Sequence, residues 1–434
     1  MIESWGRIPV PSHESEQPVL WRSDPLPPAV SLLAFGRGRS YGDCCLNDGG
    51  TLLTTRTLDR FLAFDAATGV LRCEGGVSLG EILALTVPRG WFLPVVPGTR
   101  HVSVGGAIAN DIHGKNHHRS GTFGRHVRRL ELLRSDGRVE CAPGDALFSA
   151  TVAGLGLTGL ITWAELQLRP VPGAFIRQET VPFETLDEFF AISAESDARF
   201  EYTVAWIDCL SQAGRGLFFR GDHVADPAQG DSMHSSPAGN AARRSTGQGA
   251  LAAIPFDFPP WALNPLTVRA FNAVYSFAQR QGPRARTVPY APFFFPLDSV
   301  AHWNRIYGKR GFYQFQCVVP ERAVIAGLIA RVAHSGTGSF LSVLKSFGDL
   351  PSPGLLSFPR KGHTLTLDFA NCGAETVALL DTLEAVVREA GGALYPAKDG
   401  RMSKETFASA YPRRTEFERH LDPAFSSSLW RRVS

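Results

Sequence analysis

The residues with the clearest chemical potential lie between positions 97 and 124, where glycine-rich backbone is combined with four histidines and one lysine. Glycine has no Cβ, so its backbone can approach a ligand closely and its N–H groups stay unobstructed. A second glycine-rich run, residues 36–43 with the sequence GRGRSYGD, lies upstream. Two such backbone cradles favour one long, phosphate-bearing ligand held from two sides, and a flavin dinucleotide fits that description.

Lysine is scarce in this chain, with six among 44 basic residues, and three of the six lie in motif-like segments. Lys345 interrupts a run of apolar residues typical of a strand. An inward-facing ammonium there needs an anionic partner, because burying an unpaired charge is very costly; a substrate phosphate or the carboxylate of Asp368 would serve. Lys398 follows Tyr395 in a loop, where a lone lysine is usually solvated. The scarcity of lysine and the nearby aromatic ring favour a role at the site.

The glycines at 36 and 38 could also begin a Rossmann nucleotide-binding turn. That fold needs a helix directly after the glycines, with the pyrophosphate at the helix N-terminus. The residues after Tyr41 read GDCCLNDGG, which is poor helix-forming sequence. A non-helical loop whose successive N–H groups form an anion-binding nest is the better prediction.

Three histidines, His113, His117 and His118, have a spacing that can place two metal ligands on one helical face. Gly114 and the preceding GGAIAN run disfavour a regular helix across them, so we expect no metal site. Structural histidines and ligand contacts remain as alternatives, with His113 and Lys115 as the best candidates for contacts. Seven cysteines without regular spacing predict reduced, buried thiols rather than a disulfide framework or a zinc site.

Several local patterns predict the elements that position these groups. Residues 61–74 alternate apolar and polar side chains about a Thr-Gly turn, which is typical of a hairpin, and residues 127–141 repeat this about Asp-Gly. Ser78 with Glu81 forms a capping box that begins a helix. The apolar spacing over 376–390 predicts another helix. Small strand-rich units joined by short helices indicate an α+β architecture.

Beyond residue 172 the composition changes. Residues 222–250 are polar and contain almost no large apolar groups, so we expect a mobile loop there. Residues 266–281 predict an amphipathic helix rich in aromatic residues. Contact of this helix with lipid is one interpretation, and burial of its apolar face within the protein is the favoured one.

Length and charge narrow the class of protein. A chain of 434 residues predicts two packed domains. The net charge of +3 gives no reason to expect nucleic acid as a partner. We see neither a signal peptide nor an apolar run of about 18 residues, so a cytoplasmic protein without a membrane-spanning helix is expected.

Together, the segments GRGRSYGD, DIHGKNHH and YPAKDGR resemble the flavin-dependent oxidases of the vanillyl-alcohol-oxidase / p-cresol-methylhydroxylase superfamily (VAO/PCMH), and within it the decaprenylphosphoryl-ribose 2-oxidase family. The likeness extends over nearly the whole chain. It implies an α+β, two-domain PCMH/VAO-type fold that binds FAD. Residues 1–172, completed by 393–434, would form the FAD-binding domain, and residues 173–392 would form a substrate domain built on an antiparallel sheet.

The resemblance also implies which residues contact the FAD. They come from both glycine-rich runs, from the start of the strand at 160 and from the C-terminal segment. The expected cofactor-binding residues are Gly36, Arg37, Gly38, Arg39, Ser40, Tyr41, Gly42, Asp43, Pro97, Gly98, Thr99, Ser103, Val104, Gly105, Gly106, Asn110, Asp111, Ile112, His113, Asn116, Leu160 and Tyr395. Covalently flavinylated relatives carry a histidine where this chain has Arg39, so we expect non-covalent FAD.

The same resemblance assigns the groups around the substrate. The expected catalytic residues are Lys398, Gln316, Tyr41 and His113. The expected substrate-binding residues are Lys115, Gln314, Lys345, Phe294, Thr366 and Asp368. Thr366 stands where mycobacterial enzymes have an inhibitor-reactive cysteine, and Phe294 stands where they have the tyrosine of a lid over the active site.

The implied reaction is oxidation of a secondary sugar hydroxyl, the 2′-OH of a polyprenylphosphoryl pentose, to a keto sugar by hydride transfer to flavin N5. This would be half of an epimerisation, with a short-chain dehydrogenase/reductase as a candidate partner and peripheral contact with the inner membrane as a candidate location. An FAD-dependent oxidase of free alditols or aldonolactones is the alternative. A catalytically silent flavin-binding protein that works with a reductase is a further one.

Overall fold

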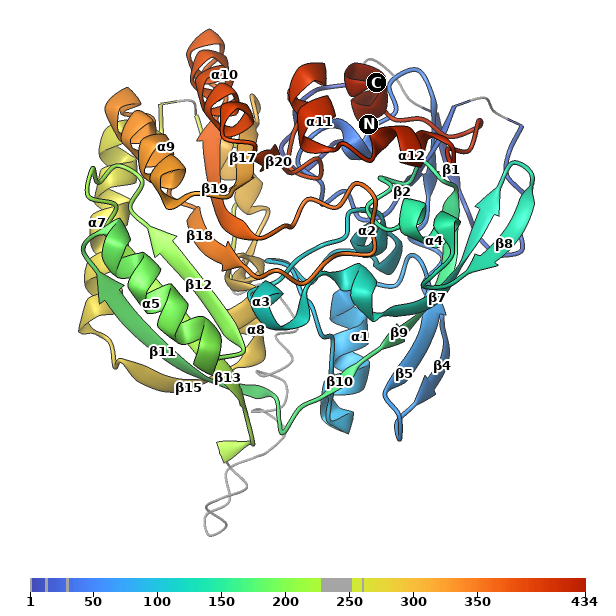
Figure 1. The fold of residues 1–434 in the computed structure, drawn as a ribbon, viewed down its shortest axis with the longest axis horizontal. Coiled ribbons are helices and arrows are strands. Elements are labelled where there is room, and N and C mark those ends of the chain that lie inside the picture. Colours follow the sequence, from blue (N-terminus) through green and yellow to red (C-terminus); the bar gives the residue numbers. More distant parts are fainter. Residues whose placement is uncertain (1, 12–14, 29–30, 228–251, 260) are drawn as a thin grey trace.

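The structure is a computed structural model, and it describes residues 2–11, 15–28, 31–227, 252–259 and 261–434. Its elements form two halves that lie side by side in Figure 1, one built on small sheets and the other on a single large sheet. Helices and mostly antiparallel sheets are mixed in both halves, so the predicted α+β class is confirmed.

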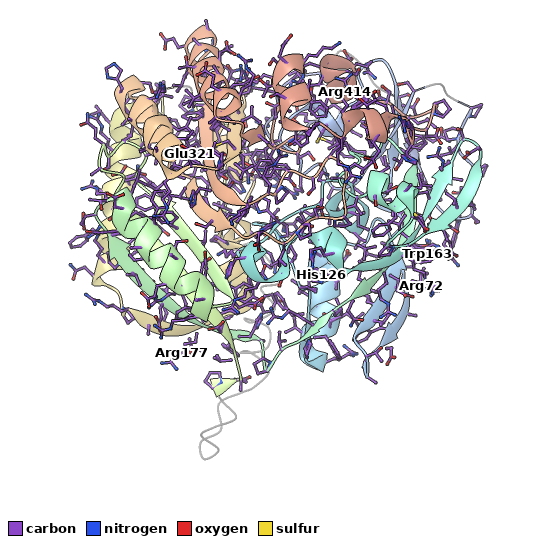
Figure 2. The ribbon with its side chains drawn as sticks, viewed as in Figure 1. Arg72, His126, Trp163, Arg177, Glu321 and Arg414 are labelled. Atoms are coloured by element: carbon purple, nitrogen blue, oxygen red, sulfur yellow. The ribbon has the colours of Figure 1, made fainter. Side chains whose placement is uncertain are left out.

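The first half contains a five-stranded antiparallel sheet and a three-stranded parallel one. In spatial order the larger sheet is β4 (Phe61–Asp65), β5 (Val70–Glu74), β9 (Leu160–Gln167), β7 (Val127–Arg134) and β8 (Gly137–Cys141). The smaller is β1 (Ser15–Pro18), β3 (Thr51–Thr54) and β2 (Leu32–Phe35). Both predicted hairpins are confirmed, and Gly69 and Gly137 supply the positive φ angles, 70° and 130°, of their turns. Between β5 and β9, the guanidinium of Arg72 lies 4.9 Å from the ring centroid of Trp163 (Figure 2).

Short helices fill the space beside these sheets. They are α1 (Leu79–Thr86), α2 (Val104–Ala109), α3 (His117–Ser120) and α4 (Ala146–Thr151), with 3-10 turns η1 (Asp43–Cys45), η2 (Val87–Arg89) and η3 (Phe123–His126). The capping box predicted at Ser78 begins α1. Strands β6 (Trp91–Phe92) and β10 (Arg169–Pro170) pair separately.

The second half is built on an eight-stranded antiparallel sheet. Its spatial order is β15 (Ala285–Pro289), β11 (Phe175–Phe183), β13 (Gly216–Val224), β12 (Tyr202–Ile207), β18 (Ser342–Phe347), β19 (Gly362–Ala370), β17 (Phe312–Val319) and β20 (Ala393–Leu394). Helices α5 (Leu186–Arg199), α9 (Arg322–Ser335) and α10 (Ala374–Glu389) lie over one face (Figure 1). Buried side chains of these helices, such as Phe189, Leu328 and Leu383, belong to one large hydrophobic cluster with side chains of the sheet.

The remaining elements surround the other face of this sheet. They are β14 (Ala252–Ala253) paired with β16 (Val300–Ala301), α7 (Pro265–Gln281), α8 (Tyr290–Phe294), and the 3-10 turns η5 (Pro296–Ser299) and η6 (Trp303–Tyr307). Tyr275 of α7 packs edge-on against Trp206 of β12, with ring centroids 5.0 Å apart. Among the described residues, no helix is long and apolar enough to cross a membrane.

The C-terminal segment returns to the first half, where α11 (Lys404–Ala410), α12 (Arg414–Glu418) and α13 (Ser428–Val433) lie (Figure 1). Phe425 forms a parallel bridge with Leu32 of β2. Strand β20, which the sequence assigned to the start of this C-terminal completion, instead joins the large sheet as its edge strand beside β17.

Two sequence predictions need correction. The expected loop 222–250 begins too early, because Asp222 to Val224 complete strand β13; residues 228–251 lie outside the described part of the chain. The favoured burial of the apolar face of the 266–281 helix is wrong. In α7 only Val268 and Asn272 are buried, and several large apolar side chains face solvent.

Candidate active site

Among the described residues, a large cavity with a volume of about 1200 Å³ lies between the glycine-rich loops of the first half and the open face of the large sheet. Pockets for drug-sized ligands usually measure about 300–1,000 Å³. The volume is therefore sufficient for a dinucleotide together with part of a second ligand.

One wall is the loop that follows β2. Gly38 has φ 61°, a conformation that glycine adopts without strain, and only the short turn η1 follows, so the prediction of a non-helical loop is confirmed. Within the described chain, the backbone amides of residues 37–40 donate to no protein atom. These amides are available as a nest for anionic oxygens.

The second glycine-rich run lies directly against the first. Ser103 accepts a hydrogen bond from Gly106 N and begins α2. A Cβ on Gly36 would lie 2.3 Å from Ser103 Oγ, so only glycine allows this approach. Gly98 lines the cavity, and a Cβ on it would meet no protein atom within 4 Å. The added side chain would enter the space that a ligand needs.

The charge of these walls suits an anionic dinucleotide. The Nε atoms of Arg37 and Arg39 are buried without a described hydrogen-bond partner, although Arg37 also pairs with Glu81 through its Nη2. The Arg39 guanidinium lies 4.2 Å from the ring centroid of Trp5, and burial lowers its pKa. Amides without a described protein acceptor, half-buried cations and open space beside Gly98 therefore fit a flavin dinucleotide with its pyrophosphate.

Most of the predicted cofactor residues line this cavity. They are Gly36, Arg37, Gly38, Arg39, Ser40, Tyr41, Pro97, Gly98, Thr99, Ser103, Gly105, Gly106, Asn110, Ile112, His113, Leu160 and Tyr395. Five others lie behind its wall: Gly42, Asp43, Val104, Asp111 and Asn116. Their side chains or backbone hold the loops in place and do not face the ligand space.

Asp111 illustrates this supporting role. Its fully buried carboxylate accepts hydrogen bonds from Gly124 N at 2.8 Å, Ser352 Oγ at 2.5 Å and Ser357 Oγ at 2.6 Å. Asn116 similarly donates to Pro94 O at 2.9 Å. A buried polar group must find such partners, because leaving it without them costs about 1–3 kcal/mol.

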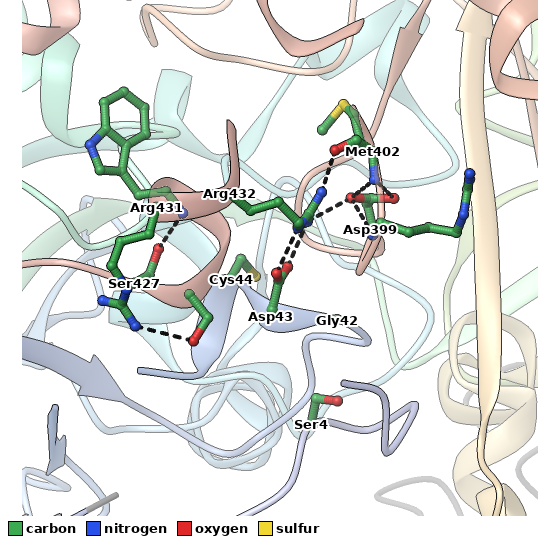
Figure 3. A network of polar contacts seen from close by, with 12 residues as sticks. Ser4, Gly42, Asp43, Cys44, Asp399, Met402, Ser427, Arg431 and Arg432 are labelled. Atoms are coloured by element: carbon green, nitrogen blue, oxygen red, sulfur yellow. Dashed lines mark hydrogen bonds and ion pairs between the residues drawn. The ribbon is translucent and has the colours of Figure 1, made fainter. Parts of the chain in front are cut away.

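Gly42 and Asp43 belong to a second supporting network. A Cβ on Gly42 would lie 1.6 Å from the carbonyl oxygen of Asp399. Arg432 of α13 donates to both oxygens of Asp43, at 2.9 and 2.8 Å, and to Asp399 at 3.0 Å (Figure 3). This guanidinium therefore ties the first glycine-rich loop to the loop that carries Lys398.

The opposite wall is polar and comes from three neighbouring strands. Successive side chains of a strand point to opposite faces, so residues two apart share one face. Gln316 of β17 pairs with Thr366 of β19, which in turn pairs with Val343 of β18, and all three line the cavity. On the same face, Lys345 lies two residues after Val343, and Gln314 lies two residues before Gln316.

His113 connects the two walls. Its Nε2 lies 2.9 Å from Gln316 Nε2, and its Nδ1 lies 3.3 Å from Lys345 Nζ. Burial and the nearby Lys345 hold the pKa of His113 well below its usual range, so the ring is neutral. Burial, with Lys398 nearby, lowers the pKa of Lys345 to about 7. Of the two partners predicted for Lys345, a substrate phosphate remains a prediction; within the described chain, Lys345 contacts His113 rather than the carboxylate of Asp368.

Lys398 and Asp368 influence each other electrostatically at the other end of this polar wall. Lys398 Nζ lies 3.7 Å from the centroid of the Tyr41 ring, and burial lowers its pKa to about 8 despite the opposing effect of Asp368. Burial raises the pKa of Asp368 to about 7. Asp368 does not line the cavity, because it lies behind Gln314, whose Nε2 donates to its Oδ1 at 2.5 Å. Burial raises the pKa of Tyr41 far above its usual value.

Lys115 and Phe294 complete the predicted substrate group. Lys115 Nζ donates to the carbonyl oxygen of Phe293 and lies 4.4 Å from its ring centroid. Burial, with Lys345 nearby, lowers the pKa of Lys115 to about 7. Phe294 lines the cavity, is 1% exposed and packs against Tyr202 with ring centroids 4.7 Å apart.

His117 and His118 do not line the cavity. The His117 ring packs against Phe347 with centroids 4.5 Å apart, and His118 Nε2 lies 3.0 Å from Phe200 O. No cluster of three or more metal-ligating side chains occurs among the described residues.

The sequence reasoning missed an apolar extension of the cavity. It is lined by Val204, Trp206, Phe219, Tyr275, Leu341 and Val343. We call these six residues the apolar arm. A signal for part of it was present, because Leu341 and Val343 precede Lys345 at intervals of two and so share its face of the sheet. Nothing local to the sequence indicates that α7 supplies Tyr275.

Comparison with known proteins places these features in context. Residues 28–142 match a family described as an FAD binding domain. The chain is 37% identical over 417 residues to the decaprenylphosphoryl-beta-D-ribose oxidase of Mycolicibacterium smegmatis, a match that covers 93% of this chain and 89% of that protein. It is 34% identical over 374 residues to an uncharacterized protein of Streptomyces coelicolor, covering 82% of this chain and 100% of that protein. A shorter match, 29% over 177 residues, covers 39% of this chain and 42% of an alditol oxidase from a Streptomyces species. The predicted FAD cofactor is confirmed by these matches.

The opening at Gly98 gives a test of the cofactor site. We expect Gly98→Leu to lower the FAD content of the purified protein at least tenfold. No protein atom lies within 4 Å of the new Cβ, so the leucine side chain would extend into the cavity and occupy space that FAD needs. FAD absorbance per mole of protein measures the effect.

Gly282→Leu is the matched control. A Cβ on this exposed glycine would meet only the carbonyl oxygens of Gln279 and Ala278, at ordinary distances of 3.5 and 3.7 Å, so FAD content and the unfolding temperature should stay unchanged. Normal FAD content in Gly98→Leu would remove this wall from the cofactor site.

Proposed function

The chain belongs to the family of FAD-dependent oxidoreductases that includes the decaprenylphosphoryl-beta-D-ribose oxidase of Mycolicibacterium smegmatis, and we propose that it oxidises the 2′-OH of a polyprenylphosphoryl pentose to a ketone. The observation that supports this substrate is the shape and chemistry of the large cavity described above. Its glycine-rich wall, its cluster of amines and its apolar arm are continuous with one another.

Each part of such a substrate has a counterpart in the cavity. The amines of Lys115 and Lys345 suit a phosphate, because cations near an anionic oxygen form strong, charge-assisted hydrogen bonds. Gln314, Gln316 and Lys398 can bind sugar hydroxyls. The apolar arm suits the first units of a prenyl chain.

FAD, when bound, supplies the acceptor for the hydride of the carbinol carbon. The residues of the glycine-rich runs and Tyr395 would hold it, and Arg39, in place of a histidine, would leave it without a covalent link. The protein must then remove the hydroxyl proton. Lys398 is the best acceptor for it, because its lowered pKa of about 8 lies near the operating pH and its amine lies against Tyr41 of the first glycine-rich loop. The amines of Lys115 and Lys345 already contact Phe293 O and His113. Tyr41 keeps its proton, and both ring nitrogens of His113 already have partners.

The shape of the cavity favours this function over its alternatives. A free alditol or aldonolactone would leave the apolar arm empty and would not use the cations for a phosphate. A catalytically silent flavin-binding protein would have no use for buried amines, which cost stability unless a ligand compensates them.

The proposed product suggests a partner enzyme, and the proposed substrate suggests a location in the cell. A short-chain dehydrogenase/reductase could reduce the keto sugar from the opposite face and so complete an epimerisation. A lipid-linked substrate resides in a bilayer, so we propose a cytoplasmic enzyme with peripheral contact to the inner membrane.

Anaerobic mixing tests the proposed substrate. The FAD-loaded enzyme should lose its flavin absorbance within seconds on addition of a synthetic farnesylphosphoryl pentose. A free alditol and a free pentose should leave the absorbance unchanged at the same concentration. Bleaching by the alditol alone would overturn the proposal in favour of a soluble polyol as substrate.

Lys398 gives a second test through its pH dependence. An amine whose pKa is lowered to about 8 loses its proton as the pH rises through that value, and only the neutral amine accepts a proton. The rate of flavin reduction should therefore rise as the pH passes about 8 and then level off. Lys398→Ala should lower the rate by about 10²–10⁴-fold, the usual contribution of a general base, and remove this pH step.

The control for this variant is Lys404→Ala, which removes an exposed lysine at the start of α11. Both variants should keep normal FAD content. A rate that falls as the pH rises through 8 would instead assign Lys398 a role as a cation.

A further inference from the structure

Large apolar side chains are unusually exposed on and just before helix α7. Of the ten large hydrophobic residues that are exposed in the described chain, six lie between positions 256 and 277. Leu266, Val274 and Phe277 are 74%, 68% and 66% exposed, and Trp261, before the helix, is 76% exposed. Isolated exposed apolar residues are normal on a protein surface, but a concentration of this kind marks a surface that binds something.

The spacing shows that these side chains form one stripe. Leu266, Ala270, Ala273, Val274 and Phe277 recur at the intervals that place residues on one side of a helix, and all five are exposed. The opposite side of α7 holds the helix on the protein. There Val268 and Asn272 are buried, and Asn272 Nδ2 donates to Asp208 Oδ1 at 2.8 Å. The helix is thus fixed by its inner side and presents an apolar outer side to solvent.

The charge around this stripe is mostly positive. Residues 252–289 contain four arginines and a single acidic residue, Asp257, which pairs with Arg7 at 2.6 Å. Of the arginines, Arg280 pairs with Glu184, and no ion pair is described for Arg269, Arg284 or Arg286, all of which are exposed. An apolar stripe bordered by arginine and tryptophan has the composition of a helix that lies in the interface of an anionic bilayer.

The stripe also continues into the cavity. Phe271, which is 46% exposed, stacks on Tyr275 with centroids 6.0 Å apart, and Tyr275 is part of the apolar arm. Phe271 also contacts Phe340, next to Leu341 of the same arm, with centroids 5.5 Å apart. An apolar path therefore leads from the inside of the cavity to the outer surface of α7.

We propose that α7, with Trp261, is a docking surface for an anionic phospholipid bilayer and places the apolar arm at the lipid surface. This inference rests on the proposed function, because the apolar path would let the prenyl chain of a substrate pass from the bilayer into the cavity without crossing water. The arginines would bind lipid phosphates, and Leu266, Val274 and Phe277 would enter the acyl boundary.

Vesicle flotation of the FAD-loaded enzyme tests docking without any substrate. The wild type should float with vesicles of phosphatidylglycerol and phosphatidylcholine, and should bind pure phosphatidylcholine vesicles at least tenfold more weakly. The triple variant Leu266→Ser/Val274→Ser/Phe277→Ser should lose at least tenfold in affinity for the anionic vesicles. Leu20→Ser/Phe61→Ser, which removes exposed apolar side chains elsewhere, should bind like the wild type.

Turnover separates this inference from the proposed function. On a water-soluble farnesylphosphoryl pentose, the triple variant should reduce its flavin at the wild-type rate, because none of the three residues lines the cavity. On a long-chain substrate embedded in vesicles, its rate should fall at least tenfold. If neither protein is reduced by any prenylphosphoryl pentose but docking still occurs, the proposed function fails while the docking surface stands.

Three results would overturn the docking surface. The first is a wild type that floats with neither kind of vesicle. The second is a triple variant that floats as well as the wild type. The third is a wild-type dimer in solution that the triple variant converts to a monomer, since α7 would then be covered by a second copy of the chain.

Discussion

One half-buried guanidinium ties together the two chemically active loops. Arg432, the third residue from the C-terminus, donates to Asp43 beside the first glycine-rich run and to Asp399 beside Lys398. Burial raises the pKa of Asp399 to about 6, so this carboxylate stays charged at neutral pH with Arg432 as its partner. Loss of one partner from such a buried network costs about 3–5 kcal/mol, because it leaves the others uncompensated. This contact helps to hold the loop of Lys398 against the first glycine-rich loop.

Features that depend on neighbouring residues could be predicted from the sequence. The capping box at Ser78 and the helix that ends before Gly391 follow from short patterns, and both are present. The non-helical loop at Gly38 was also predicted from a short pattern, and the amides of residues 37–40 donate to no atom of the described chain. Most of the residues that were expected to bind the cofactor line the cavity. They were predictable because each glycine-rich run is a continuous stretch of backbone that forms part of the wall.

Features that depend on distant residues could not be predicted in this way. Asp111 was expected to contact the flavin, but its carboxylate is taken by Ser352 and Ser357, more than two hundred residues away. The contact between Lys345 and His113 likewise depends on how the large sheet packs against the first half of the molecule, which no local pattern reveals. For α7 the apolar periodicity was read correctly, yet periodicity alone does not say whether the apolar side faces the protein or its surroundings.

The proposed reaction requires that this cavity hold FAD beside Lys398 and that the hydride leave C2 of a lipid-linked pentose. The most direct measurement is anaerobic stopped-flow reduction of the flavin by farnesylphosphoryl pentose that carries deuterium at C2, compared with the same compound deuterated at C3. Deuterium at C2 should slow bleaching severalfold, and deuterium at C3 should leave the rate unchanged. Equal rates with both compounds, or slowing by C3 deuterium alone, would contradict the assignment of the reacting carbon.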